Sequence, residues 1–223
     1  MMTNLFSTFD PSTSSSTSLN WMSNLILFIV IPPTFWMMNS RAYMMLKYTL
    51  MKLNSEFNMV MNYTNKSSIM MFLSIFIMLL VNNMMGLFPY IFTSTSHLTM
   101  TISMALPMWL SFNLYGWMNK TNHMFEHLLP SGTPAILMPF MVCIESISNM
   151  IRPGTLAIRL AANMIAGHLL LILLGNMGSK INEFMMMTII LIQTLLLMLE
   201  LAVSMIQAYV FSVLTSLYSS EIN

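Results

Sequence analysis

The sequence predicts an all-α integral membrane protein with five membrane-crossing helices, one amphipathic surface helix and a long, steeply tilted C-terminal helix hairpin. Of the 223 residues, 57% are hydrophobic and only 7% are charged, and the mean hydropathy is +0.73. A water-soluble domain of this size could not cover its surface with so few charges. The net charge of +1 argues against a nucleic-acid-binding surface. We expect residues 1–20 to form a polar tail and residues 21–223 to form one membrane domain.

Five apolar runs define the expected spans, because a helix needs about 20 predominantly apolar residues to cross a bilayer. The runs cover residues 21–38, 69–92, 98–118, 135–178 and 184–217. The first run is barely long enough, and tryptophans near both of its ends suit a membrane interface. Pro32 and Pro33 predict a kink in this run.

Residues 41–65 differ from the five runs, because their apolar residues recur at three- and four-residue steps. Those residues are Leu46, Leu50, Leu53, Phe57, Val60 and Met61. Charged side chains lie opposite them, which is typical of an amphipathic helix on a membrane surface. Residues 41–66 also hold four of the eight basic residues. The positive-inside rule therefore places this segment and the C-terminus on the inner side, and the N-terminus on the outer side.

The last two runs are too long to be upright spans. Residues 135–178 would make a straight helix of about 66 Å and residues 184–217 one of about 51 Å, whereas the hydrocarbon layer is about 30 Å thick. Such lengths require steep tilt or breaks, for which Pro139 and Pro153 are candidates. We therefore expect a long, oblique hairpin.

Four ionisable residues lie inside the run 135–178, where a charge at the bilayer centre costs about 2.5–3.5 kcal/mol on insertion scales. They are Glu145, Arg152, Arg159 and His168. At about 100° per residue, the first three drift slowly around one helix face, and His168 points roughly to the opposite side. Asn163 continues the arginine face, with Ala162 and Ala166 beside it. Small residues let another helix approach this face closely.

These residues predict an ion or proton pathway or a buried ion pair. For Arg152, an ion pair with Glu145 or a side chain that reaches a lipid head group is the alternative. For Arg159, apolar sequence on both sides makes that alternative weak. In the other runs, Asn82 and Asn83 could hydrogen-bond between helices or line a proton path. Glu200 could instead be a protonated, packed acid.

Several further features carry weaker signals. His123 to His127 reads HMFEH, which matches a zinc-protease pattern, but we expect a solvated inner loop over residues 119–134 and no metal site. Cys143 stands alone and most simply packs in the apolar run. The 30 methionines are spread without period, which favours a mitochondrial codon bias over a copper site. No glycine-rich phosphate loop is present, so we expect neither a nucleotide site nor a cofactor.

Three stretches together resemble subunit a of the rotary F-type ATP synthase in its mitochondrially encoded animal form. They read NNMMGLFPYIFTSTSHL (82–98), GTPAILMPFMVCIESISNMIRPGTLAIRLAANMIAGHLLLILLG (132–175) and LELAVSMIQAYVFSVLTSLY (199–218). The combination of residues that carries the resemblance is Arg159, Asn163, His168, Glu200 and Gln207. The resemblance runs from about residue 68 to the C-terminus.

The resemblance implies a proton-conducting stator subunit in the mitochondrial inner membrane, which is not an enzyme on its own. Its expected partners are a ring of small proton-carrying subunits, the c-ring, together with peripheral-stalk and other small membrane subunits and the bilayer. His168 and Glu200, helped by Asn82 or Asn83, would form an outer half-channel. An inner half-channel would use Glu145, Ser148 and Arg152. Arg159 would separate the two, and Gln207 would hydrogen-bond near it.

Two other classes of membrane protein remain as alternatives to this interpretation. A quinone-associated subunit of a respiratory complex would also be hydrophobic and rich in methionine. However, the four histidines form no facing pairs for haem, and no lysine–glutamate relay repeats across the spans. A secondary transporter would be expected to show an inverted repeat, which is not visible.

Overall fold

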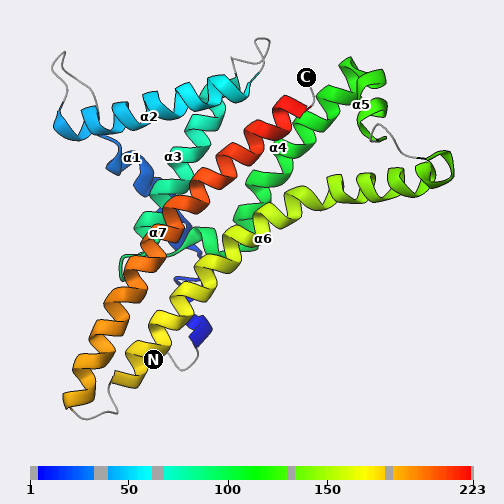
Figure 1. The fold of residues 1–223 in the computed structure, drawn as a ribbon. Helices are drawn as coiled ribbons and strands as arrows, with labels where there is room; N and C mark the ends of the chain where they lie inside the picture. Colours follow the sequence, from blue (N-terminus) through cyan, green and yellow to red (C-terminus); the bar gives the residue numbers. More distant parts are fainter. Residues whose placement is uncertain (1–4, 33–39, 62–67, 130–133, 179–182, 222–223) are drawn as a thin grey trace.

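The computed structural model describes residues 5–32, 40–61, 68–129, 134–178 and 183–221, and these residues form helices and no strand (Figure 1). The short elements are η1 (Leu5–Phe9), η2 (Leu19–Leu25), α1 (Ile26–Val30), η4 (Ser94–Ser96), α5 (Thr121–His127) and η5 (Ala135–Leu137). The long helices are α2 (Arg41–Val60), α3 (Ile69–Gly86), α4 (Leu98–Asn119), α6 (Met138–Gly178) and α7 (Glu183–Glu221). The expected all-α class is confirmed.

Three of the described helices, α3, α6 and α7, are long and apolar enough to cross a membrane. The helix α4 covers the predicted span 98–118 and extends to Asn119, but it is not one of these three. The first run forms η2 and α1 and leaves the helical conformation at Ile31, directly before Pro32, as the residue before a proline commonly does. Residues 33–38 of that run lie outside the described residues. The count of five crossings therefore stays a prediction.

The second span is shorter than predicted, because α3 ends at Gly86 and not near residue 92. Pro89 has no N–H and disfavours the helical conformation of the residue before it. Tyr90 has a φ of 70°, a left-handed backbone conformation in which the α-helix cannot continue. A Cβ on Gly86 would lie 3.0 Å from the Thr93 methyl group, so the glycine lets the returning chain pack closely against α3. Residues 93–96 are consequently buried.

The predicted amphipathic helix is present as α2, and its apolar face packs on protein. The Ser40 hydroxyl caps its first turn by accepting the Tyr43 N–H. Phe57 is buried and meets the Phe72 ring of α3 at 6.4 Å between centroids. At the same helix, Glu56 accepts a hydrogen bond from the Tyr209 hydroxyl of α7 (3.1 Å). The periodicity thus predicted the apolar face correctly, and α3 and α7 cover at least part of it.

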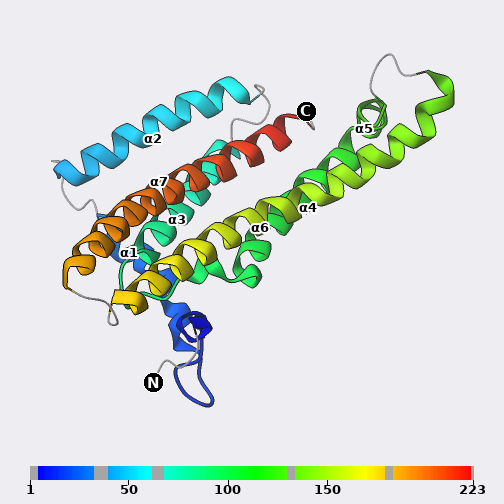
Figure 2. The same ribbon diagram turned by 60° about the horizontal axis from the view of Figure 1, so that its bottom comes forward.

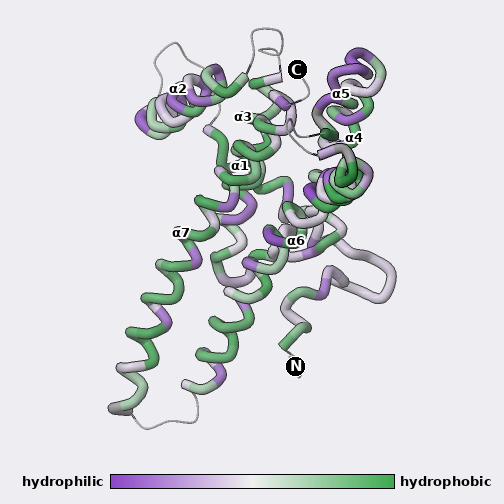
Figure 3. The backbone as a smooth tube through the Cα atoms, turned by 45° about the vertical axis from the view of Figure 1, so that its right-hand side comes forward, coloured by the Kyte–Doolittle hydropathy of each residue, from purple (hydrophilic) through white to green (hydrophobic). Residues whose placement is uncertain are grey.

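The hairpin is present as two long helices, with 41 residues in α6 and 39 in α7. The helix α6 begins at Met138 and not at residue 135, and α7 extends beyond residue 217 to Glu221. At about 1.5 Å per residue, both helices exceed the bilayer's hydrocarbon thickness of about 30 Å. Pro153 lies inside α6, and the helix changes direction along its length, running beside α7 in its C-terminal half and turning away toward α5 in its N-terminal part (Figures 1 and 2). Hydrophobic residues predominate along both helices of the hairpin (Figure 3). The steep tilt in a membrane stays a prediction.

The inner loop expected over residues 119–134 instead contains the helix α5. Its apolar residues face the end of α4, where the Phe125 and Trp117 rings meet edge to face at 5.1 Å. This packing stabilises α5. Pro130, Gly132 and Pro134 follow α5 in the sequence and therefore do not interrupt it. Among the described residues, no group of three or more His, Cys, Asp or Glu side chains could hold a metal ion.

The core lies where α3, α4, α6 and α7 cross. Its buried residues are Leu79, Ala105, Leu156, Ala157, Leu160, Ala208 and Phe211. Small residues with hydroxyl groups are also buried on α7. Their hydroxyl groups donate hydrogen bonds to backbone carbonyls in the preceding turn; the residues include Ser204, Ser212, Thr215 and Ser216. Because these side chains are short, neighbouring helices can approach α7 closely.

We expect Ser216→Leu to destabilise the bundle by about 1–3 kcal/mol, because extra methylene groups have no room at a fully buried position. Ser220→Leu is the matched control, since Ser220 makes the same kind of backbone hydrogen bond (2.8 Å) but is only half-buried. Thermal unfolding of the detergent-solubilised protein measures both. Equal melting temperatures for the two variants would contradict this account of the packing.

Candidate functional site

Two titratable groups meet on the hairpin, where Glu200 of α7 lies against Gly167 of α6. A Cβ on Gly167 would come within 2.8 Å of the Glu200 carboxyl carbon and Oε1, so only glycine leaves room for the carboxyl group there. His168 is the next residue, and it lines a cavity of about 240 Å³ together with Glu200 and Asn163. The sequence predicted that His168 and Glu200 could meet, and the structure brings them to one cavity.

The polar atoms of this pair are buried without partners among the described residues. They are His168 Nε2 and both carboxyl oxygens of Glu200. A buried polar group without a hydrogen bond is costly, so such groups in native proteins usually mark bound water or function. The cavity thus holds an acid and a base that remain available for proton exchange.

One turn-to-turn contact fixes the register of the two long helices. The Gln207 side-chain amide donates to the backbone carbonyl of Arg159 (2.8 Å), and the Asn163 amide donates to Gln207 Oε1 (3.5 Å). Gln207 is buried, whereas Asn163 is exposed in the isolated chain. The predicted proximity of Gln207 to Arg159 is therefore present, although the contact uses the backbone of Arg159 and leaves its guanidinium free to point elsewhere.

Arg159 itself is exposed in the isolated chain, and its guanidinium has no ion-pair partner among the described residues. Three residues exposed on the same stretch of α6 are small or amide-bearing, namely Ala162, Asn163 and Ala166. Leu156, Ala157, Leu160 and Ala161 are buried and face the core. The helix thus buries one side and presents a permanently charged group among small residues on the other.

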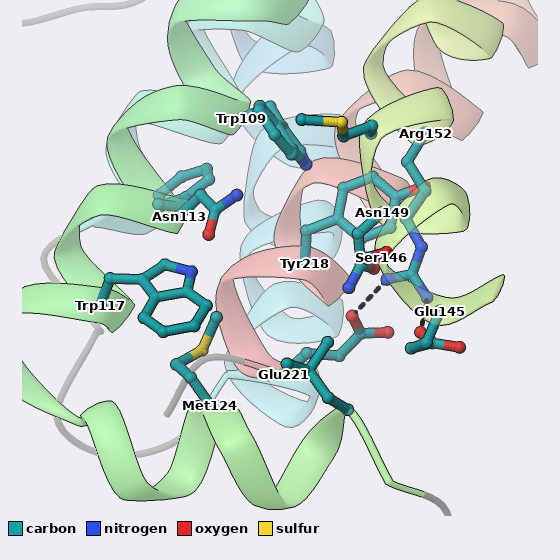
Figure 4. Close-up of a pocket in the computed structure, with 13 residues that line it drawn as sticks. Trp109, Asn113, Trp117, Met124, Glu145, Ser146, Asn149, Arg152, Tyr218 and Glu221 are labelled. Atoms are coloured by element: carbon teal, nitrogen blue, oxygen red, sulfur yellow. Dashed lines mark hydrogen bonds and ion pairs between the residues drawn. The ribbon is translucent and has the colours of Figure 1, made fainter. Parts of the chain in front are cut away.

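Arg152 lies two turns before Arg159, in the N-terminal part of α6. Its Nη1 lies 2.6 Å from Glu221 Oε2 and its Nη2 lies 3.6 Å from Glu145 Oε1 (Figure 4). The guanidinium also lies over the Tyr218 ring, 5.3 Å from its centroid. The Arg152 and Glu145 side chains are 31% and 37% exposed, so each ion pair contributes only about 0–1 kcal/mol. The alternative of an Arg152–Glu145 ion pair is therefore present in the structure.

Sequence reasoning missed Glu221, although a signal was available. Glu145 lies fourteen residues before Arg159 in α6, and Glu221 lies fourteen residues after Gln207 in α7. In an antiparallel hairpin in register at Arg159 and Gln207, these two carboxylates must come to the same level. With Arg152 they line a cavity of about 570 Å³ whose other walls include Trp109, Asn113 and Trp117 (Figure 4).

The remaining predicted site residues lie apart from the cavities. Ser148 is half-buried and donates to the Glu145 carbonyl in the preceding turn (2.9 Å), so its hydroxyl is already engaged. Asn82 and Asn83 of α3 are buried, and their amide nitrogens have no partner among the described residues. Neither asparagine lines the cavity of His168 and Glu200, although Leu87 at the end of α3 does.

Comparison with known proteins places similar sequences over the whole chain. Residues 16–220 match the family described as ATP synthase A chain. Proteins named ATP synthase subunit a are 60% identical in Locusta migratoria, 58% in Drosophila melanogaster and 56% in Anopheles gambiae. Each of these alignments covers 100% of this chain and 100% of the relative.

We expect Gly167→Ala to push the Glu200 carboxyl group away from α6, because the added Cβ would lie 2.8 Å from it. The rate at which Glu200 reacts with a water-soluble carbodiimide, followed by mass spectrometry, should change several-fold. Gly175→Ala is the matched control on the same helix, since a Cβ there meets nothing within 4 Å. The same reactivity of Glu200 in both variants would contradict the close approach.

Proposed function

This chain belongs to the ATP synthase A chain family, and from that membership we infer that it is the proton-conducting membrane subunit of a rotary ATP synthase. It supplies no nucleotide chemistry of its own, since the relatives are named as one subunit of the complex. The animal relatives and the apolar helices favour the mitochondrial inner membrane. These features disfavour the respiratory-complex and transporter alternatives.

We propose five membrane crossings, with the N-terminus in the intermembrane space and the C-terminus in the matrix. The N-terminal segment lies toward the tip of the hairpin, whereas α2, α5 and the C-terminus lie at the opposite end (Figure 1). The basic residues Arg41, Lys47 and Lys52 belong to α2, so the positive-inside rule assigns that end to the matrix. The hairpin tip then faces outward.

In this orientation the cavity of His168 and Glu200 is the outer half-channel. An imidazole and a carboxyl group that share a cavity can pass a proton along once water or a small movement brings them within hydrogen-bonding distance. Asn82 and Asn83 contribute as unpaired amides that can hold water on the way in.

The inner half-channel is the larger cavity around Arg152, with Glu145 and, newly, Glu221 as its carboxylates. Two carboxylates and one guanidinium leave a net negative charge, which favours protons and hydrated cations there. Ser148 lies one turn from Glu145, outside the cavity, and joins this half-channel as a polar residue on the Arg159 side of Glu145. Neither half-channel crosses the membrane alone.

Arg159 separates the two half-channels, and its exposed guanidinium without a counter-ion in this chain is the observation that carries the proposal. Its counter-ion is a carboxylate on a rotating ring of small subunits, the c-ring, which approaches over Ala162 and Ala166. At a separation of about 4 Å and an effective dielectric constant of about 20, that pair gains about 4 kcal/mol. The charge therefore favours the deprotonated ring carboxylate and repels a proton that would cross directly.

Arginine suits this position because it stays protonated, whereas a buried lysine can lose its proton. Each ring carboxylate passes Arg159 without its proton and is reloaded from the outer half-channel before it returns. Rotation is thus coupled to proton flow, since no proton can pass Arg159 by itself. Peripheral-stalk subunits, other small membrane subunits and lipid cover the remaining exposed apolar surface.

Arg159→Ala should abolish ATP-coupled proton transport while leaving the complex assembled, because the ring carboxylate loses its counter-charge and protons can leak. Proton pumping by reconstituted vesicles measures the loss, and native gel electrophoresis measures assembly. Arg41→Ala is the matched control, since Arg41 is an exposed arginine of α2. Full coupled transport in the Arg159 variant would refute the assignment.

Replacing both His168 and Glu200, as His168→Ala with Glu200→Gln, should reduce proton transport in part, since water can substitute for the lost groups. The pH dependence of transport should change as well, because both titratable groups of the outer cavity are gone. Transport rates measured across a pH series in the variant and in the parent protein test this. A pH profile identical to that of the parent would rule out the outer half-channel as described.

A further inference from the structure

We propose that Phe9 and His97 are positioning residues for His168, and that the N-terminal segment Leu5–Phe9 forms a cap over this histidine. The inference rests on the proposed outer half-channel and adds to it the residues that hold its histidine in place. The polar tail expected from the sequence is instead folded back onto α6.

The contact with His168 comes from the Phe9 ring. The two rings lie edge to face, with centroids 6.4 Å apart and planes at 77°. Such a pair restricts rotation of the imidazole, and aromatic pairs of this kind are favourable beyond their buried area. The His168 Nε2 atom is buried, so the orientation of the ring decides whether this nitrogen can face Glu200.

A hydrogen bond to His97 holds the backbone of Phe9. His97 Nε2 lies 2.8 Å from the Phe9 carbonyl oxygen, and because a carbonyl can only accept, Nε2–H is the donor. The chain positions of the two residues are 88 apart, so this bond ties the N-terminus to the turn before α4. The bond forms in both the neutral Nε2–H tautomer and the charged form of His97.

Aromatic rings in turn hold His97. Its ring stacks on Phe92 at 5.2 Å and lies against Trp21 at 5.3 Å, and Trp21 meets Phe92 edge to face at 5.7 Å. Trp21 comes from η2, and Phe92 and His97 come from the stretch between α3 and α4. The contacts with Phe92 and Trp21 therefore hold the imidazole of His97 in the orientation in which it donates to Phe9.

Polar contacts close the loop that carries the cap. The Asn20 amide donates to the Asp10 carbonyl (3.2 Å). The Ser12 N–H and hydroxyl donate to the Asp10 carboxylate at 3.0 and 2.8 Å, which lowers the pKa of Asp10 and keeps it negative near His97. The segment Leu5–Phe9 is thus held by the His97 hydrogen bond at Phe9 and by the Asn20 hydrogen bond at the next residue, Asp10.

The function of the cap follows from these contacts. With Phe9 in place, His168 keeps one ring orientation and is shielded from the outer aqueous phase. Without it, the ring turns more freely, meets Glu200 less often and becomes accessible to reagents from outside. Loss of one aromatic pair lowers the population of the held ring orientation by about two- to tenfold, and we expect proton delivery to slow by the same factor.

The test uses the assembled complex in vesicles with four single variants. Phe9→Leu removes the ring, His97→Leu removes the donor, and His97→Gln keeps a donor. Phe6→Leu is the matched control, because Phe6 belongs to the same short helix but is 68% exposed. Passive proton conduction is measured, and labelling of His168 by diethyl pyrocarbonate from the outer side is followed by mass spectrometry.

Phe9→Leu and His97→Leu should slow conduction about two- to tenfold and increase the labelling of His168. Phe6→Leu and His97→Gln should behave as the parent protein, which separates the hydrogen bond from a general loss of structure. Parent-like conduction and labelling in Phe9→Leu would overturn the proposal, and this variant decides even if His97→Leu does not assemble. His97→Gln behaving as His97→Leu would overturn the role of the hydrogen bond.

Arg159→Ala in the same vesicles distinguishes failure of this inference from failure of the proposed function. Coupled transport lost in Arg159→Ala but unchanged in Phe9→Leu would overturn the cap alone. Coupled transport retained in Arg159→Ala would overturn the half-channel mechanism on which the cap depends.

Discussion

The charge of Arg159, which no carboxylate among the described residues neutralises, is the constraint on which the rest of the structure depends. Arg159 lies in the middle of a 41-residue apolar helix, yet no carboxylate in the described residues pairs with it. A charge left this way in a bilayer is costly, at about 2.5–3.5 kcal/mol or more. The cost is acceptable only if a partner supplies the counter-ion, and the small residues beside Arg159 leave space for that partner.

The register of the hairpin places Glu200 on one side of Arg159 along the hairpin and Glu221 on the other. Gln207 holds the Arg159 backbone, which aligns α7 with α6. The same alignment sets Glu200 against Gly167 toward the tip and Glu221 beside Arg152 toward the other end. Acidic groups therefore lie on both sides of the central arginine in two separate cavities, as an interrupted proton path requires.

The two cavities differ in whether their ionisable groups are paired. Around Arg152, carboxylates and guanidinium pair with each other at a half-exposed site, so charged groups are tolerated there. Around His168, an acid and a base are buried without partners, and the N-terminal segment covers the histidine. In the proposed mechanism, the first site equilibrates with bulk water and the second transfers single protons.

The sequence by itself determined the all-helical class, the apolar face of α2, the presence of two unusually long hairpin helices and the place of Arg159 among small residues within one of them. These features follow from local periodicity and from the cost of placing charge in an apolar phase, which neighbouring residues reveal. It also suggested that His168 and Glu200 meet, because His168 follows Arg159 in one helix of an antiparallel hairpin and Glu200 precedes Gln207 in the other.

Only the tertiary structure decided the end of α3 at Gly86, the helix in residues 121–127, the pairing of Glu221 with Arg152 and the return of Phe9 to His168. The last two depend on contacts between residues far apart in the chain, such as Phe9 and His97. The first two depend on contacts over a few residues, such as Gly86 with Thr93 and Trp117 with Phe125, which periodicity alone does not report. Sequence periodicity describes one helix at a time, so it cannot report how far a segment folds back or which side chain it meets there. Packing between elements supplies that information, because a side chain is fixed only by the atoms around it.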